Sequence, residues 1–207
     1  TEANLADVYA LSLKHKARYC FDDKHWYLWD NPCWKKDTQR QILISTKGFI
    51  RDAVKQAIDN GATGFARSLL MFLSAQKLEN LEKLARSEVP IKLTDFDIHP
   101  MQLCVGNGVV DLTTGTLKAS DPSMHHSKVA GTAYNSNASC PRFIQFLDGI
   151  FPDDVELVRY VQKVAGYTLT GSTTEQCLFM LLGGGANGKS TLVNVLIKIM
   201  GDYAANT

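Results

Sequence analysis

The chain has 207 residues, of which 45% are hydrophobic. This length and composition allow one large or two small globular domains with a buried core. The 22 Lys and Arg residues nearly balance the 21 Asp and Glu residues, and the formal net charge is +1. This balance excludes a globally basic nucleic-acid binder but leaves room for local basic patches. No apolar run approaches the length of a membrane span, so we expect no membrane partner.

The five cysteines are widely scattered, form no C-x-x-C pair and share no metal-site spacing with the five histidines. A reduced, intracellular and therefore cytoplasmic protein is the simplest interpretation. The adjacent residues His125 and His126 have no second ligand cluster near them in the sequence. We expect this pair to belong to a solvated strand or loop.

Helical and strand patterns alternate in the N-terminal half. Residues 3–18 have apolar residues at helical spacing, which predicts an amphipathic helix with a basic last turn. Residues 19–34 contain short aromatic runs separated by turn residues, which is typical of strands. Residues 37–59 and 63–86 are again helical in pattern, and we expect a break near Ser74.

Between residues 103 and 117 the pattern changes to two or three short strands. The dipeptide Asn107-Gly108 lies between two apolar runs and is a strong hairpin signal. Thr114-Gly115 makes the next turn, and residues 119–138 form the one plausible linker.

Two helices are predicted after this linker. Pro141 can occupy the first turn of a helix over residues 141–151, with Ser139 as its cap. Asp153 is the expected cap of a second helix, over residues 155–169. Apolar residues line one face of the second helix, so it can pack against a core.

Residues 183–190 match the pattern G-x-x-x-x-G-K-[ST] at every fixed position. The apolar run 177–182 before them predicts a buried parallel strand, and residues 191–200 after them predict a helix that ends at Gly201. Strand, glycine loop and helix are the context in which this pattern binds phosphate. An ordinary glycine-rich turn between a core strand and a helix is the alternative.

The chemistry of such a loop depends on its backbone. Glycines let backbone N–H groups close around a polyphosphate, and the following helix presents its positive dipole end to the same anion. Lys189 would reach the β- and γ-phosphates as the catalytic cation, and the Ser190 hydroxyl would bind Mg²⁺, so ATP and Mg²⁺ are the expected ligands. The predicted nucleotide-binding residues are Gly183, Gly184, Gly185, Ala186, Asn187, Gly188, Lys189, Ser190 and Thr191.

An ATPase of this type needs further strands, an acidic residue for Mg²⁺ and a group that positions water. We therefore expect a fragment with an α+β fold: a mostly helical N-terminal domain with short β-hairpins, followed by the first β-loop-α unit of a P-loop, AAA+-like ATPase. The expected segments are an N-terminal domain (1–138), a helical segment before the motor (139–175) and a truncated ATPase domain (176–207).

Six sequence motifs in this order resemble the phage and plasmid primase-helicase family, which is related to the poxvirus primase-helicase and belongs to the superfamily III helicases. The combination of N-G-V-x-D-L-x-T-G with G-x-N-G-K-S is specific. The motifs are W-Y-L-W-D at residues 26–30, F-D-I-H-P at 96–100, N-G-V-V-D-L-T-T-G at 107–115, C-P-R-F at 140–143, G-Y-T-L-T-G at 166–171 and G-A-N-G-K-S at 185–190.

The resemblance implies a hexameric ring that hydrolyses ATP while it moves along single-stranded or forked DNA, in a bacterial host or phage-infected cell. The second acidic motif, the sensor residue and the arginine finger of these helicases have no counterpart in the chain, and neither has the primase domain. We therefore expect the parent to be an ATPase and the chain itself to be inactive.

Alternatives to this enzyme remain. The domain before the motor could be a non-enzymatic module that binds DNA, a primase or a neighbouring subunit. Trp26, Tyr27, Trp29 and Trp34 could stack on bases, with Lys35, Lys36 and Arg40 on phosphates, although aromatic residues of a hairpin can equally pack onto helices. An unrelated P-loop kinase is disfavoured, because the loop follows a long helical domain.

Overall fold

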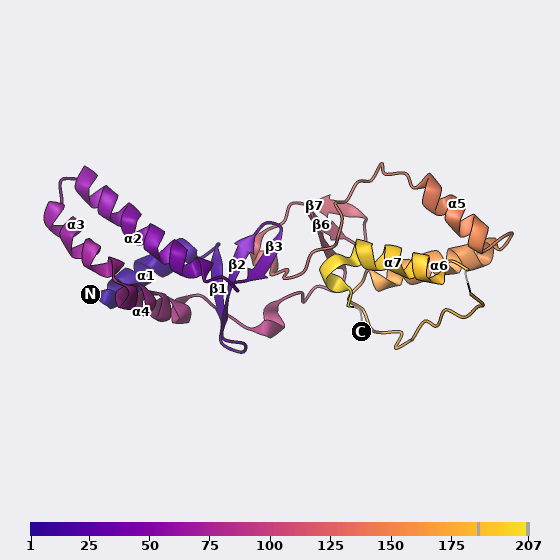
Figure 1. The fold of residues 1–207 in the computed structure, drawn as a ribbon, viewed down its shortest axis with the longest axis horizontal. Helices are drawn as coiled ribbons and strands as arrows, with labels where there is room; N and C mark the ends of the chain where they lie inside the picture. The colour runs from indigo at the N-terminus through magenta and orange to yellow at the C-terminus, as the bar shows by residue number, and fades with distance from the viewer. Residues whose placement is uncertain (186, 206–207) are drawn as a thin grey trace. The chain divides into compact units, whose positions relative to one another are not determined.

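A computed structural model describes residues 1–185 and 187–205. The chain divides into two compact units, Thr1–Phe96 (unit 1) and Asp97–Thr207 (unit 2) (Figure 1). Helices and short strands occur in both units, which confirms the predicted α+β class. Among the residues described, no helix is long and apolar enough to cross a membrane. The three segments expected from the sequence (1–138, 139–175 and 176–207) do not coincide with these two units. The division into those segments stays a prediction.

Unit 1 follows the predicted order of elements. The predicted break near Ser74 is confirmed, since this residue is the N-cap of α4. The elements are α1 (Glu2–Leu13), β1 (Ala17–Cys20), β2 (His25–Asp30), β3 (Cys33–Lys36), α2 (Gln41–Asp59), α3 (Thr63–Leu70), η1 (Met71–Leu73), α4 (Ala75–Ala85), η2 (Arg86–Glu88), β4 (Pro90–Ile91) and η3 (Leu93–Asp95).

The first helix is shorter than predicted. It ends at Leu13, and Arg18 lies in β1, so the expected basic last turn was wrong. The reason is that Ala17–Cys20 pairs with β2, and such a non-local pairing outweighs the local helical pattern.

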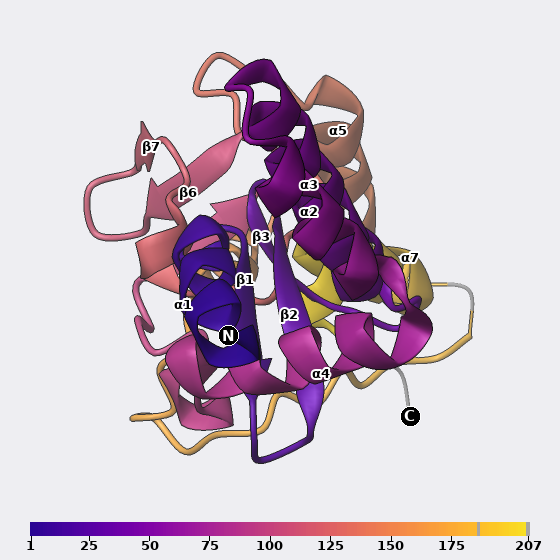
Figure 2. The ribbon, with the colours of Figure 1, turned by 90° about the vertical axis from the view of Figure 1, so that its left-hand side faces the viewer.

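The strands of unit 1 form one sheet in the order β3-β2-β1-β4. Neighbouring strands are antiparallel except β4, which joins β1 in parallel. Figure 2 shows α1, α2 and α4 in front of these strands. Tyr19 and Trp26 pack with the helices in the main core, whereas Cys20 and Tyr27, which alternate with them along the strands, belong to a second cluster.

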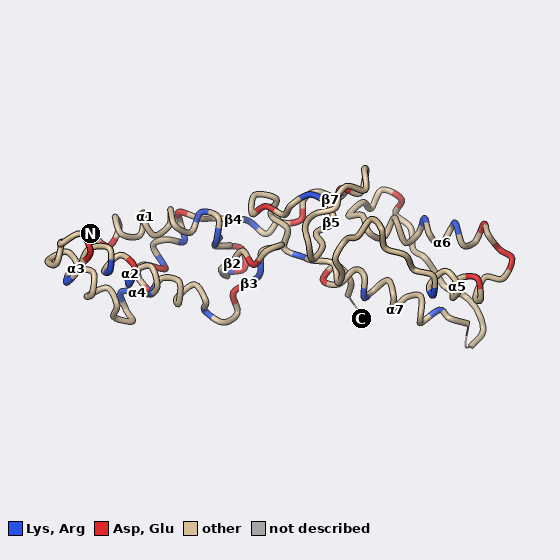
Figure 3. Tube along the Cα trace, turned by 90° about the horizontal axis from the view of Figure 1, so that it is seen from above, with Lys and Arg blue, Asp and Glu red and all other residues tan. Residues whose placement is uncertain are grey.

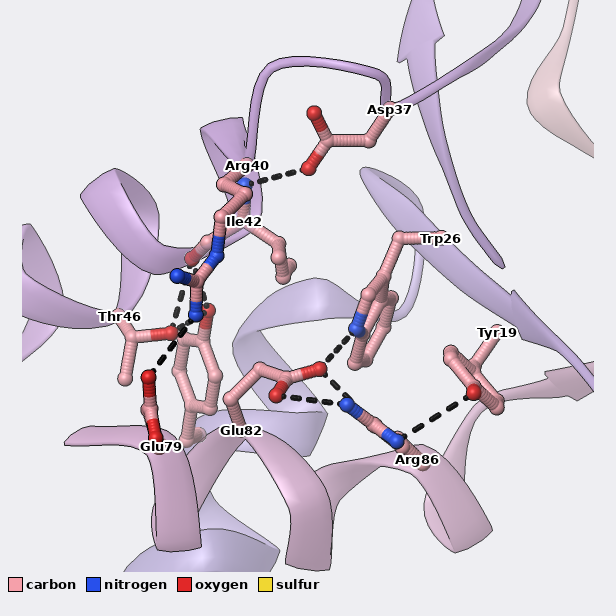
Figure 4. Close-up of polar contacts among 10 residues, drawn as sticks. Tyr19, Trp26, Asp37, Arg40, Ile42, Thr46, Glu79, Glu82 and Arg86 are labelled. Carbon is pink, nitrogen blue, oxygen red and sulfur yellow. Dashed lines mark hydrogen bonds and ion pairs between the residues drawn. The ribbon is translucent and has the colours of Figure 1, made fainter. Parts of the chain in front are cut away.

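A buried carboxylate connects the helices of unit 1 to the sheet. Glu82 of α4 is 6% exposed and accepts hydrogen bonds from Trp26 Nε1 and from Arg86 Nε (3.0 Å) and Nη2 (2.9 Å) (Figure 4). Arg86 Nη1 also donates to the Tyr19 hydroxyl (3.3 Å). Because a buried charge is costly unless it is paired, these bonds make the position of α4 specific with respect to β1 and β2.

We predict that Glu82→Gln lowers the free energy of unfolding of unit 1 by about 2–3 kcal/mol, because Arg86 loses its charged partner and Trp26 keeps a weaker acceptor. Urea denaturation followed by tryptophan fluorescence measures this value. All three tryptophans of the chain lie in unit 1, so the signal reports that unit.

The matched control is Glu79→Gln, one helical turn away on α4. Glu79 accepts from Arg40 Nη2 at 3.0 Å in an exposed pair. Exposed pairs contribute about 0–1 kcal/mol, so the control should change stability little. Equal effects of the two substitutions would contradict the structural role of Glu82.

In its described residues, unit 2 combines a three-stranded antiparallel sheet, in the order β5-β6-β7, with three α-helices. The strands predicted between residues 103 and 117 are confirmed within a few residues at their ends. The same holds for the helices predicted over 141–151, 155–169 and 191–200. The elements are β5 (Gln102–Val105), β6 (Gly108–Asp111), β7 (Thr116–Lys118), η4 (Pro122–Met124), α5 (Pro141–Ile150), α6 (Val155–Thr168), α7 (Lys189–Met200) and η5 (Gly201–Tyr203).

The β5–β6 turn lies one residue earlier than predicted. It consists of Gly106 and Asn107, because Val105 already pairs with Gly108. Gly108 has a φ of 150°, and a Cβ there would overlap the Lys118 carbonyl of β7. Glycine is therefore needed at this position for the close approach of two strands and not for the turn itself.

Both predicted helix caps in unit 2 were wrong by one residue. The N-cap of α5 is Cys140 and not Ser139. Asp154, not Asp153, caps α6, and its carboxylate accepts from Leu157 N at 2.9 Å. A cap depends on the backbone conformation of a single residue, which a sequence pattern does not resolve.

The C-terminal end of α7 is held by backbone contacts. Gly131 N–H donates to the Ile199 carbonyl (2.9 Å), and a Cβ on Gly131 would overlap the Lys198 carbonyl. The neighbouring Ala130 N–H donates to the Cys104 carbonyl of β5 at 2.8 Å. This segment therefore joins α7 to the sheet of unit 2.

Candidate functional site

The glycine loop, residues 183–188, leads directly into α7. Gly188 is the N-cap of that helix and has a left-handed backbone, with φ 81° and ψ −4°. Gly183, at the other end of the loop, has a φ of 152°. The first N–H groups of a helix have no partner within it, and the positive dipole end lies there. The start of α7 is therefore suited to an anion.

The Lys189 side chain turns back onto the loop. Its ammonium donates to the carbonyls of Gly183 (2.8 Å) and Gly184 (2.9 Å) and to Asn187 Oδ1 (2.6 Å). These three acceptors hold the positive charge at the mouth of the loop. If phosphate oxygens replaced these three acceptors, the ammonium could donate the same three hydrogen bonds to the phosphates.

A cavity of about 580 Å³ opens beside the glycine loop. A Cβ on Gly188 would lie 2.7 Å from Ile150 Cγ2 and 3.1 Å from the Phe146 ring, so this glycine lets α5 approach the loop. The cavity is lined by Phe146, Ile150, Gly184, Gly185, Asn187, Gly188, Lys189, Ser190 and Thr191.

Most of the predicted nucleotide-binding residues thus line one cavity. Gly183 contributes its carbonyl to Lys189, and Ala186 lies outside the residues that the structure describes. Within the described ranges, no group of three or more His, Cys, Asp or Glu residues could hold a metal ion. The binding roles assigned to these residues stay predictions.

The strand predicted before the loop was wrong. Residues 177–182 form no strand, and Leu178 and Leu182 are 84% and 82% exposed. A strand needs a neighbour for its backbone N–H and C=O groups, and no segment in the described ranges pairs with this one. The local sequence pattern does not show whether such a neighbouring strand exists.

The aromatic residues of unit 1 are mostly core residues. Trp26, Tyr27 and Trp34 are 5%, 8% and 0% exposed, so they are not available for base stacking and the hairpin-packing alternative describes them. Lys36 forms an ion pair with Asp23 (3.0 Å). The stacking hypothesis for these three rings was therefore wrong.

Trp29 differs, because it is only partly buried and lies on the wall of a groove of about 490 Å³ with Lys35 and Lys36. Asp30 and Asp37 line the same groove, so it carries both signs of charge. Figure 3 likewise shows basic and acidic residues interspersed along the trace of each unit.

A second cavity of unit 2, of about 240 Å³, was missed by sequence reasoning. Asp97, Gln102 and His126 line it, and His126 is only 2% exposed, so the expectation of a solvated His125-His126 pair was wrong for this ring. Burial alone would raise the pKa of the Asp97 carboxyl, but His126 and Ser127 lower it below its usual value. Asp97 belongs to the sequence motif F-D-I-H-P. This motif was the one feature noted in the sequence that could have drawn attention to the cavity.

Residues 5–152 match the family model described as "D5 N terminal like". The match covers more than half of the chain, so the chain belongs to this family, whose domain occurs in phage and viral primase-helicase proteins. It therefore supports the resemblance to that class for the part of the chain before the glycine loop. A search of curated proteins gave no match.

We predict that Gly188→Ala lowers the free energy of local unfolding at the start of α7 by about 1–3 kcal/mol. The reason is that the added Cβ meets Ile150 and that the left-handed backbone is unfavourable for alanine. Hydrogen exchange of the α7 amides measures the loss of protection. Gly185→Ala is the control, since a Cβ there meets nothing within 4 Å. Wild-type exchange in Gly188→Ala would show that α5 does not constrain the loop.

Proposed function

We propose that the chain is the front part of a replicative, ATP-dependent DNA helicase of the primase-helicase type, from a phage, prophage or plasmid. The family match over residues 5–152 supports the class. The assignment of ATP binding rests on one observation: the glycine loop holds the Lys189 ammonium at the N-terminus of α7.

In this proposal the ATP polyphosphate occupies the cavity beside the glycine loop. The backbone N–H groups at the start of α7 would bind phosphate oxygens, and Lys189 would exchange its carbonyl acceptors for the β- and γ-phosphates. This cation would counter the charge that develops on the transferred phosphoryl group. Phe146 and Ile150 would exclude water from one side of the loop.

A bound Mg²⁺ ion would supply positive charge against the phosphates of ATP. Ser190 supplies one hydroxyl ligand for it, but no acidic side chain is among the described residues that line the loop cavity. The described residues that line the cavity therefore supply only part of the ligand set that Mg²⁺ needs. An acidic ligand and a group that positions water would have to come from other strands of the parent protein, and these strands would also cover residues 177–182.

The family resemblance also bears on assembly and substrate. The parent would form a homo-oligomeric ring, a hexamer, and would act on single-stranded or forked DNA. In that assembly the α+β part before the glycine loop would position the motor.

We predict that Lys189→Ala abolishes ATP hydrolysis by the parent protein, because the loop loses its cation. Lys189→Arg should also fail, since three loop acceptors surround a compact ammonium and a planar guanidinium does not match them. Steady-state phosphate release measures both. Wild-type turnover in full-length Lys189→Ala would overturn the assignment.

The 207-residue chain by itself is expected to show no hydrolysis above background, because the Mg²⁺ ligand set is incomplete. Turnover by this chain that disappears in Lys189→Ala would contradict the incomplete-site part of the proposal. It would leave the phosphate-binding assignment in place.

A second candidate function is a non-enzymatic module that binds DNA or a protein partner. The groove with Trp29, Lys35 and Lys36 favours it, because a partly exposed aromatic ring next to lysines is a common arrangement in single-strand binding. The family match also ends before the glycine loop.

If the groove binds single-stranded DNA, Lys35→Ala should weaken binding uniformly across sequences and reduce the slope of log K against log salt by about 1. Lys47→Ala on α2 is the control, because Lys47 is exposed and does not line the groove. Fluorescence anisotropy with a labelled oligonucleotide at several salt concentrations measures both. Equal effects of the two substitutions would exclude the groove as the contact surface.

A further inference from the structure

The shortest of the three hydrogen bonds of the Lys189 ammonium goes to a side chain of the glycine loop. Asn187 Oδ1 accepts from Lys189 Nζ at 2.6 Å, whereas the carbonyls of Gly183 and Gly184 accept at 2.8 and 2.9 Å. Residue 187 is a variable position of the pattern G-x-x-x-x-G-K-[ST], so the pattern itself gives Asn187 no role. The structure indicates one, because this amide contacts the cation of the loop.

The first glycine of the loop makes room for the Asn187 amide. A Cβ on Gly183 would overlap Asn187 Nδ2 and would lie 3.4 Å from Lys189 Nζ. The φ of Gly183 is 152°, a backbone conformation that also disfavours a side chain. Gly183 therefore allows the amide nitrogen of Asn187 to lie against the start of the loop while the amide oxygen holds the ammonium.

The contact between Asn187 and Lys189 is local, unlike the two carbonyl contacts. Asn187 and Lys189 are two residues apart and flank Gly188, the N-cap of α7, whereas the two carbonyls lie five and six residues from Lys189. A rearrangement limited to residues 183–185 would break both carbonyl bonds and leave the Asn187 bond intact. An ammonium has three N–H donors. Two of them would then pass to the β- and γ-phosphates, and the third would stay on Asn187.

Lys189 lies on the boundary between two cavities. Besides the cavity beside the glycine loop, Asn187 and Lys189 line an apolar cavity of about 430 Å³, whose walls include Tyr160, Leu178 and Leu182. A lysine side chain is flexible, and its stem can lie along apolar surface. The bond to Asn187 restricts this freedom and keeps the ammonium directed at the glycine loop.

A neutral amide is the suitable acceptor for this task. It accepts a hydrogen bond without cancelling the charge of the ammonium, whereas a carboxylate would cancel that charge and repel a phosphate. None of the described residues that line the loop cavity is acidic. The charge of Lys189 therefore remains available to a polyphosphate.

We propose that Asn187 is a positioning residue of the nucleotide site, which acts by holding the Lys189 ammonium toward the phosphates and does not bind a phosphate itself. This role rests on the proposed ATP-binding function. It makes Asn187 and Lys189 one functional unit, so the effects of substituting them should not add.

The first test measures ATP binding to the 207-residue protein by isothermal titration calorimetry. Asn187→Leu keeps the approximate size of the side chain and removes the acceptor, so affinity should fall about 3- to 10-fold, the effect of an exposed hydrogen bond to a charged group. In the Lys189→Ala background the same substitution should change affinity by less than about twofold. Asn194→Leu is the control, because Asn194 is exposed on α7 and lines neither cavity.

The outcomes separate this role from the proposed function. An equal loss of affinity in both backgrounds would mean that Asn187 binds phosphate directly and would overturn the positioning role. Wild-type affinity in folded Asn187→Leu, checked by circular dichroism, would overturn it as well. A wild-type chain that binds no ATP would instead overturn the proposed function, and this role with it.

A second measurement needs no nucleotide and decides if Lys189→Ala binds ATP too weakly to measure. The ¹⁵N relaxation of the Lys189 ammonium should show faster internal motion in Asn187→Leu than in the wild type. Asn187→Asp keeps an oxygen acceptor, so its ammonium should be as restricted as in the wild type, yet ATP should bind more weakly because the carboxylate repels the phosphates. A merely structural role of Asn187 would not produce this split between mobility and affinity. Equal mobility of the ammonium in all three proteins would contradict the positioning role.

Discussion

The close contact between Gly131 and the end of α7 determines where the glycine loop can lie in unit 2. The Gly131 N–H bonds to the Ile199 carbonyl, and the absence of a side chain on Gly131 lets the two backbones touch. At the other end of the helix, Gly188 permits the approach of Ile150 and Phe146. Two glycines therefore set both ends of α7, and the loop takes its position from the helix.

Unit 1 depends on a different kind of constraint, a buried charge network. Glu82 accepts bonds from Trp26 and Arg86, so the aromatic strand residues are fixed against α4. This network accounts for the burial of Trp26, whereas Tyr27 and Trp34 are buried in the second cluster with Cys20 and Ile91. Among the three tryptophans, only Trp29, on the side of the groove, combines partial exposure with neighbouring lysines. Of the tryptophans, Trp29 alone is therefore accessible to a base.

Elements with a local cause could be predicted from the sequence, and elements with a non-local cause could not. The helices α2 and α7 have their C-caps at Asn60 and Gly201, the residues that their patterns predict, because helical spacing and terminal residues act within a few positions. The strand expected over residues 177–182 needs a partner elsewhere, and β4 consists of only two residues that pair with β1.

The candidate sites divide in the same way. The glycine loop was recognisable because its chemistry is carried by consecutive residues, and the structure places most of them around one cavity. The cavity of Asp97, Gln102 and His126 is assembled from segments far apart in sequence. His126 looked like a solvated loop residue because nothing next to it in the sequence indicates burial. Its environment is a property of the tertiary structure alone.

Two cavities of unit 2 lie at opposite ends of one helix. The glycine loop lies at the N-terminus of α7, where the dipole favours anions, and the Asp97 cavity includes its C-terminal residue Met200, where the dipole favours cations. Twelve residues of helix span about 18 Å, which exceeds the Debye length of about 8 Å at physiological salt. The Asp97 carboxylate would therefore act only weakly on a phosphate at the glycine loop. Any coupling between the two cavities would have to be mechanical, through a shift of α7 against Gly131 at one end and Ile150 at the other.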